Sequence, residues 1–213
     1  MPLFSKNGKT LLFIHIPKTA GTSITYFFKE NGFTVRWFSY FDRFSQEPSP
    51  QHRHGEKIIE FLHKDSIKYD YSFTIVRDPL DRLISEYFGQ LRENDELSRM
   101  FTSKDFTYWV ESVLKFHEKN PVYFDNHLRP QVEFLLEDTR VFRYENNFED
   151  FFSFLKQIDK ECNFGIDFKK IGHYKKGLNK VSMNISQEIR NKVFQFYAND
   201  YVRLYPFACE SIC

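Results

Sequence analysis

The chain has 213 residues, of which 41% are hydrophobic and 19% aromatic, including 26 Phe and 12 Tyr. This length and aromatic content indicate one packed domain over residues 1–213 and exclude an intrinsically disordered chain. A formal net charge of +1 excludes the broad positive field of nucleic-acid-binding proteins, so no nucleic-acid partner is expected. No apolar run is long enough for a secretory leader or a membrane span. The three cysteines follow no metal-ligand spacing, which favours reduced thiols in a cytoplasmic protein.

Strand-like and helix-like patterns alternate along the chain. Residues 10–16 are rich in β-formers and almost wholly apolar, which predicts a buried parallel strand, and residues 21–30 predict the helix that follows. The later predicted strands are 33–38, 71–76 and 140–143, and the later predicted helices are 56–64, 80–91, 103–136 with a break near Asn120-Pro121, 147–158 and 186–200 with Ser186 as N-cap. This alternation predicts an α/β fold, a single domain with a mainly parallel central sheet flanked by helices.

The segment LLFIHIPKTAGTS at residues 11–23 is the strongest chemical signal in the chain. It predicts a strand that leads into a loop and a helix, and N–H groups at a helix start bind phosphate. Lys18 adds a full positive charge, and Thr19, Thr22 and Ser23 add hydroxyl donors. The segment is not a Walker A sequence, because its lysine comes before Gly21 rather than after it. A phosphate-bearing donor other than ATP or GTP is therefore favoured.

A second phosphate-binding signal is FTIVRDPLDRLISEYF at residues 73–88. Arg77 leaves the predicted strand at the carboxyl edge of the sheet, the same edge as Lys18, where α/β folds bind ligands. Its guanidinium can grip a phosphate through two parallel hydrogen bonds, with the Ser85 hydroxyl as a further donor. The plainer alternative is that Arg77 pairs with Asp78 or Asp81 and that Ser85 is an ordinary helix residue.

The order IPKTAGTS and then IVRDPLDRLISEY resembles the sulfotransferases that use 3′-phosphoadenosine 5′-phosphosulfate (PAPS). It is most similar to their carbohydrate branch, which includes heparan sulfate 2-O-sulfotransferase. The resemblance implies a P-loop-kinase-like sulfotransferase fold and a domain that covers the whole chain. It implies that the 5′-phosphosulfate is bound by Lys18, Thr19, Ala20, Gly21, Thr22 and Ser23. It also implies that Arg77 and Ser85 bind the 3′-phosphate.

The segment QHRHGE at residues 51–56 matches a His-x-His of the heparan branch. The resemblance implies that His54 is the catalytic base, with His52 as its neighbour and the alternative base. The chemistry agrees, because the acceptor hydroxyl must lose a proton and histidine titrates closest to neutral pH. The plainer alternative is that both histidines are exposed loop residues.

Two further segments carry weaker signals from the resemblance. In DNHLRPQVEFL, residues 125–135, His127, Arg129 and Gln131 are expected to line the acceptor side, with structural roles as the alternative. In the basic stretch 173–177, Lys175, Lys176 and Gly177 are expected to close a loop over the nucleotide, with a solvated run of charge as the alternative.

The sequence therefore predicts an enzyme that moves a sulfuryl group from PAPS to an acceptor hydroxyl, on a saccharide or a small molecule. Adenosine 3′,5′-bisphosphate is the expected product, Lys18 the residue that stabilises its leaving oxygen, and no metal is expected to be required. One alternative is a Mg²⁺-dependent small-molecule or nucleotide kinase. Another is a non-catalytic nucleotide-binding protein on the same scaffold.

Overall fold

The structure is a computed structural model that describes residues 1–38, 47–93, 103–122, 124–170 and 183–206. The predicted nucleotide-covering residues Lys175, Lys176 and Gly177 lie outside the described residues.

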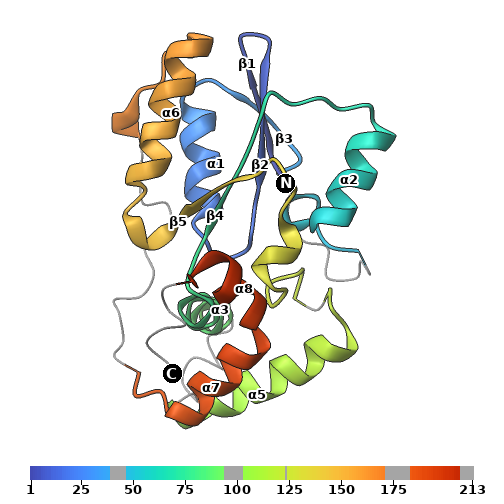
Figure 1. Cartoon of the computed structure of the whole chain (residues 1–213), viewed down its shortest axis with the longest axis vertical. Helices are drawn as coiled ribbons and strands as arrows, with labels where there is room; N and C mark the ends of the chain where they lie inside the picture. The colour runs from blue at the N-terminus through green and yellow to red at the C-terminus, as the bar shows by residue number, and fades with distance from the viewer. Residues whose placement is uncertain (39–46, 94–102, 123, 171–182, 207–213) are drawn as a thin grey trace.

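The described strands form one five-stranded sheet in the order β3-β1-β2-β4-β5 (Figure 1). Its strands are β1 (Leu3–Lys6), β2 (Lys9–Ile14), β3 (Thr34–Arg36), β4 (Tyr71–Val76) and β5 (Arg140–Arg143). The pairs β2–β4 and β4–β5 are parallel, whereas β1 pairs antiparallel with both β2 and β3. The sheet is therefore mixed, and the prediction of a mainly parallel sheet is corrected.

The correction comes from the hairpin that joins β1 to β2. Asn7 and Gly8 at its tip have φ of 51° and 74°, the left-handed pair that a two-residue hairpin turn requires. Sequence analysis overlooked β1, because its four residues are too few to show a period of their own. With β1 paired to β2, the edge strand β3 joins the sheet through β1.

The described helices are α1 (Gly21–Glu30), α2 (Gly55–Lys64), α3 (Pro79–Glu93), α5 (Ser103–Lys119), α6 (Glu149–Cys162), α7 (Gln187–Phe196) and α8 (Ala198–Leu204). Short 3₁₀ turns lie at Pro50–His52, Gln131–Phe134, Tyr144–Asn146 and Phe168–Lys170. The predicted helix over 103–136 is right as far as Lys119 and wrong beyond it. Phe124, Asp125 and Asn126 all have positive φ, which no α-helix accommodates. The predicted last helix is two helices, and its N-cap is confirmed, since Ser186 Oγ accepts from the N–H of Ile189 at 3.4 Å.

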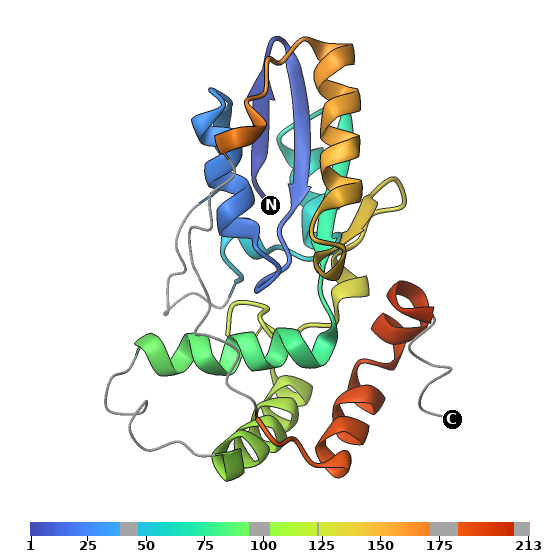
Figure 2. The same cartoon turned by 90° about the vertical axis from the view of Figure 1, so that its left-hand side faces the viewer.

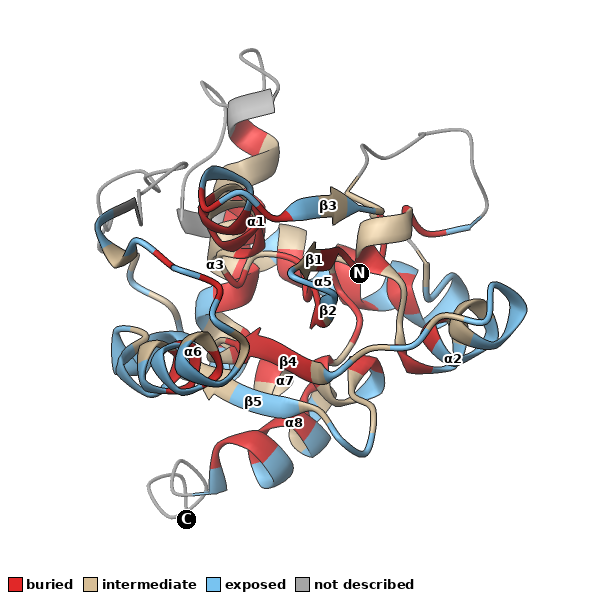
Figure 3. Cartoon of the chain, turned by 90° about the horizontal axis from the view of Figure 1, so that it is seen from above, coloured by how far each residue is buried: buried red, intermediate tan, exposed pale blue. Residues whose placement is uncertain are grey.

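Alternate residues of β2 supply two hydrophobic clusters on opposite faces of the sheet. Leu11 and Phe13 pack with α1 and α6 in one cluster, in which many of the side chains are phenylalanine. Leu12 and Ile14 belong to the other cluster, which contains residues of α2, α3, α5, α7 and α8. Figure 3 shows the buried strands β2 and β4 between α1 and α6 on one side and α2 on the other.

Helix α3 crosses beneath the carboxyl ends of β2 and β4, α5 and α7 lie below it, and α8 lies beside its end (Figure 2). The segments after β2 and β4 therefore enter one region, between the sheet and α3. Among the described residues, no helix combines the length and the apolar character needed to cross a lipid bilayer.

Candidate active site

The connection from β2 to α1 brings a lysine and three hydroxyl residues to the carboxyl edge of the sheet. Lys18 and Ala20 have left-handed backbones, with φ of 68° and 72°, a conformation that residues with side chains seldom adopt. Thr19 is fully buried, and its hydroxyl donates to a backbone carbonyl three residues earlier at 2.8 Å. Thr22 and Ser23 are half-buried in the first turn of α1, where the N–H groups have no partner within the helix. This arrangement suits a bound anion.

Gly21 begins α1, and the ring beneath it explains why a glycine is needed. A Cβ at position 21 would overlap the imidazole of His15. His15 is buried, and this burial, followed by the nearby His52, lowers its pKa well below the usual value. An uncharged ring therefore supports the loop from below.

The ammonium of Lys18 lies against α3. Its Nζ is 3.8 Å from Oε2 of Glu86, and the Lys18 side chain keeps 20% of its surface exposed. The same Nζ is 2.5 Å from the point where a Cβ at position 89 would lie. Gly89 thus leaves room for the lysine in the middle of a helix, where glycine is otherwise unfavourable.

Arg77 leaves β4 directly beside the Lys18 loop. Its Nη1 donates to the carbonyl of Lys18 at 3.5 Å, and its guanidinium lies 4.7 Å from the ring centre of Tyr144. The side-chain amide of Gln131 accepts from the N–H of Arg77 at 3.0 Å and donates to its carbonyl at 2.8 Å. The Nε of Arg77 is buried with no hydrogen-bond partner among the described residues, so it can donate to a bound anion.

Helix α3 places three more residues along this region. Oδ1 of Asp78 accepts from the N–H groups of Leu80 and Asp81 at 2.9 and 3.0 Å, so Asp78 caps the helix and is occupied there rather than with Arg77. Ser85 is half-buried and immediately precedes Glu86. The structure therefore sets both predicted phosphate-binding motifs around α3.

His52 is buried and held on two sides. Its Nδ1 is 2.7 Å from Oδ2 of Asp125, and its backbone carbonyl accepts from Nδ2 of Asn126 at 2.8 Å. Asp125 is held in turn by Ser49, whose N–H and hydroxyl donate to its two carboxylate oxygens at 2.5 and 2.7 Å. The ring of His52 therefore has one fixed orientation, with Nδ1 on the carboxylate.

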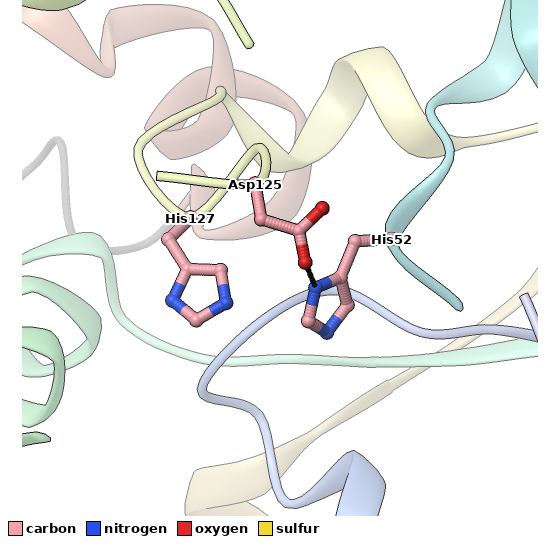
Figure 4. A group of neighbouring side chains, drawn as sticks. All are labelled: His52, Asp125 and His127. Carbon is pink, nitrogen blue, oxygen red and sulfur yellow. Dashed lines mark hydrogen bonds and ion pairs between the residues drawn. The ribbon is translucent and has the colours of Figure 1, made fainter. Parts of the chain in front are cut away.

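His52 and His127 face each other across this carboxylate (Figure 4). Their ring centres are 5.0 Å apart, and His52 also meets His15 edge-on at 4.7 Å. Nδ1 of His127 is 2.7 Å from Oε2 of Glu86, the oxygen that also lies near Lys18. Glu86 therefore connects the lysine of the loop to the histidine cluster.

The charge of Glu86 is stabilised where it lies. Burial alone raises the pKa of this carboxyl, but His127, Lys18 and the hydrogen bond from Gln90 outweigh burial and lower it to about 2. His52 shows the opposite balance, because burial and then the neighbouring His127 lower its pKa well below the usual value. At neutral pH the site holds an anionic Glu86 beside a neutral His52.

His54 lies elsewhere. It is the N-cap residue of α2, and its Nδ1 is buried without a hydrogen-bond partner among the described residues. Burial lowers its pKa, and the nearby Arg129 lowers it further. Of the two histidines in the HRH motif, the structure brings His52 beside His127 and Glu86, and it does not bring His54 there.

Arg129 and Gln131 have structural partners. Nε of Arg129 donates to Oδ1 of Asn126 at 3.0 Å, and its Nη1 pairs with Glu133 at 2.5 Å. Gln131 is fully buried, and its own N–H donates to Asp200 of α8 at 2.9 Å. Of the predicted acceptor residues, only His127 has an exposed edge, with 24% of its side-chain surface accessible.

The segment that holds these partners is fastened by another buried residue. Arg82 of α3 donates from Nη1 to the carbonyl of His127 at 2.9 Å and from Nη2 to the carbonyl of Arg129 at 2.7 Å. The Tyr197 hydroxyl donates to the carbonyl of Leu128 at 2.7 Å. Residues 127–129 are thus attached to α3 and to the C-terminal helices.

Sequence analysis did not single out Asp125, Asn126, Glu86 or Gly89. Asp125 and Asn126 begin the segment that drew attention to His127, and Glu86 follows Ser85, so only adjacency in sequence could have suggested them. Gly89 offered a clearer signal, since an isolated glycine inside a helical pattern often marks a close approach by another group.

Comparison with known proteins adds to this geometry. A model of the Sulfotransferase family matches residues 2–208, a range that contains the Lys18 loop, Arg77 and the histidine cluster. No curated protein and no solved structure matches the chain. Because the family match spans nearly the whole sequence, including both segments predicted to bind phosphate, the chain belongs to the Sulfotransferase family, whose members are transferases of sulfuryl groups.

Proposed function

We propose that this protein transfers the sulfuryl group of PAPS to an acceptor hydroxyl, with a carbohydrate as the favoured acceptor class and a small molecule as the alternative. One observation carries the proposal. The anion-binding loop after β2 and the arginine after β4 touch, with Nη1 of Arg77 3.5 Å from the carbonyl of Lys18. Two anion-binding elements side by side suit a donor with two separate phosphate groups better than a mononucleotide.

Residues 18–23 are proposed to hold the 5′-phosphosulfate. N–H groups at the start of α1 supply most of the donors, and Lys18 supplies the charge. Charge develops on the bridging oxygen as the sulfur–oxygen bond breaks, and a positioned ammonium stabilises that charge. Arg77, with its unpaired Nε, and Ser85 are proposed to hold the 3′-phosphate.

We propose His52, in place of His54, as the base. Figure 4 shows the Nδ1 of His52 on Asp125 and its other ring nitrogen turned toward the connection between β2 and α1. In this arrangement Nε2 takes the acceptor proton, the hydroxyl oxygen bonds to sulfur, and the bond to the bridging oxygen breaks. Asp125 is a positioning residue, because it fixes the ring and stabilises the imidazolium that forms.

On the acceptor side we retain His127, whose ring lies next to His52 and has an exposed edge. Arg129 and Gln131 are proposed to act as positioning residues. Arg129 supports Asn126, which holds the backbone of His52, and Gln131 holds the backbone of Arg77. No metal is assigned to the transfer, because Lys18 and the start of α1 meet the charge that develops.

The test is transfer of labelled sulfate from PAPS to a panel of saccharides and small hydroxyl compounds. His52→Ala is expected to abolish transfer while leaving the affinity for adenosine 3′,5′-bisphosphate nearly unchanged. His54→Ala should keep most of the transfer rate. Thermal stabilisation by ATP–Mg²⁺ with none by the bisphosphate would indicate a kinase and overturn the proposal. Tight bisphosphate binding without transfer to any acceptor would indicate a nucleotide-binding protein.

A further inference from the structure

Three side chains that commonly bind transition metals meet in the histidine cluster (Figure 4). One ligand atom from each of His52, Asp125 and His127 lies within 4.8 Å of the other two. His52 and Asp125 are buried, whereas His127 is half-buried, so the cluster is open on the His127 side. The ligands come from two distant stretches of chain. His52 lies in the turn at Pro50–His52, and Asp125 and His127 lie in the turn around Asp125.

The supporting contacts are those of a metal site. Protein ligands are normally fixed by hydrogen bonds from behind, and a ligand histidine typically has a carboxylate on its second ring nitrogen. His127 has Glu86 at Nδ1, which turns its Nε2 toward Asp125 and His52 in Figure 4. Ser49 donates from its N–H and its hydroxyl to Asp125. Both ligands are thus held in place before any ion arrives.

The backbone also holds the cluster in an unusual form. Phe124, Asp125 and Asn126 follow one another with φ of 53°, 54° and 62°. Left-handed backbone is unfavourable in residues that carry a side chain, and it persists where surrounding structure enforces it, often at functional sites.

We propose that His52, Asp125 and His127 form a Zn²⁺ site with an open fourth position. Two imidazole nitrogens and one carboxylate oxygen are a ligand set that zinc accepts, whereas Mg²⁺ and Ca²⁺ require oxygen ligands. Zinc takes the place of the proton between His52 Nδ1 and Asp125, and that proton moves to Nε2, so the ring stays neutral while its second nitrogen can no longer accept a proton. The oxidation state of the metal does not change.

One consequence rests on the proposed function. The ring that binds the ion is the proposed base, so bound zinc fixes His52 and replaces its carboxylate partner. Zinc is therefore expected to inhibit transfer reversibly, with chelator restoring the rate. This zinc is an inhibitor and not a cofactor of the reaction.

The experiment titrates the full chain, freed of metal by dialysis against chelator, with ZnCl₂ in a calorimeter, and then with CoCl₂ while the visible spectrum is recorded. One saturable site is expected, with the intense visible bands of four-coordinate Co²⁺. Asp125→Asn and His127→Gln each remove a direct ligand, so each should weaken zinc binding by more than the roughly 10- to 100-fold that loss of an outer-shell partner costs. His63→Ala, which removes an exposed histidine of α2, and His54→Ala, which removes the other histidine of the HRH motif, are the matched controls and should leave the affinity unchanged.

Circular dichroism and thermal melting identify any variant that fails to fold, and the Co²⁺ spectrum of the wild-type chain tests the site without any variant. The inference is overturned if the wild-type chain shows no saturable zinc binding, or if the control variants weaken binding as much as Asp125→Asn does. Because these readouts need no turnover, the zinc site and the sulfuryl transfer can fail separately. Zinc binding without inhibition would support the site and count against His52 as the base.

Discussion

The donor side and the base side of the site are built in different ways. The donor loop is one contiguous stretch, in which the hydroxyl of Thr19 bonds a carbonyl only three residues away. On the base side, His52 meets Asp125 across 73 positions of sequence and His127 meets Glu86 across 41. The proposed phosphate loop is thus encoded in one short stretch, whereas the proposed base acquires its partners through long-range packing. Glu86 joins the two sides, so substitutions around it can separate them.

The largest effect should come from the donor side. Lys18→Ala removes the charge proposed to stabilise the leaving oxygen, and loss of one such group lowers kcat by about 10²–10³-fold. Bisphosphate affinity should fall much less, because the N–H groups of α1 and Arg77 remain. Steady-state kinetics and calorimetry measure the two quantities, with Lys29→Ala at the exposed end of α1 as control. Near wild-type turnover in Lys18→Ala would refute the assignment.

On the base side, Asp125→Asn keeps the shape but removes the charge beside His52. We expect kcat to fall by about 10²-fold, because the imidazolium loses its carboxylate partner. Burial already lowers the pKa of His52, so the rate should fall only well on the acid side of neutrality, where the base becomes protonated. In Asp125→Asn this acid limb should move to still lower pH. The pH profile of kcat/KM distinguishes this result from simple loss of folding, and Asp138→Asn is the control.

Glu86→Gln removes the charge that connects the two sides, and it is expected to lower the free energy of unfolding. The pKa of Glu86 is lowered to about 2 in the folded protein, so its stabilising contribution is complete above the unfolded value near 4.5 and disappears as pH falls toward 2. That shift corresponds to about 3 kcal/mol at neutral pH. Urea unfolding should show Glu86→Gln less stable than wild type at pH 7. The difference in free energy of unfolding between the two proteins should become smaller as the pH is lowered through 4. A difference that does not depend on pH would contradict a stabilising role for the ionised carboxylate of Glu86.

The smallest effect should come from Gly89→Ala, which is expected to raise stability and to lower kcat. Alanine favours a helix interior by about 1 kcal/mol over glycine, so α3 should gain stability. The new Cβ would lie 2.5 Å from the present position of Lys18 Nζ, so the lysine must move and kcat should fall. Thermal melting and turnover are measured on the same samples. Ser153→Ala on the exposed face of α6 is the control for helix propensity alone. Unchanged turnover in Gly89→Ala would rule out the packing role of Gly89.

The contrast between local signals and long-range packing explains which features could be predicted from the sequence. The bounds of α1, β4 and β5 were predicted to the residue, because Gly21, Arg77-Asp78-Pro79 and the short RVFR run are local signals. The meeting of Lys18 and Arg77 followed from a rule about strand ends, and the structure brings the two residues together. The role of each residue at the site stays a prediction that the variants above will test.

Long-range contacts that no rule about strand ends covers were beyond such reasoning. Nothing near His52 identifies Asp125 as its partner, and choosing between His52 and His54 requires knowing which one the turn at 124–127 reaches. Strand β1 was missed for a related reason, since its place depends on pairing with β2 and not on any pattern within its four residues.

The attachment of the site to α8 has a consequence for the order of assembly. Oxygens of Asp200 accept from the N–H groups of Gln131 and Val132 at 2.9 Å, and Gln131 in turn holds the backbone of Arg77. On the proposed function, the residues of the Lys18 loop are synthesised well before α8, whose Asp200 secures the segment that holds Arg77. Full affinity for the proposed donor is therefore expected only when the last helix docks.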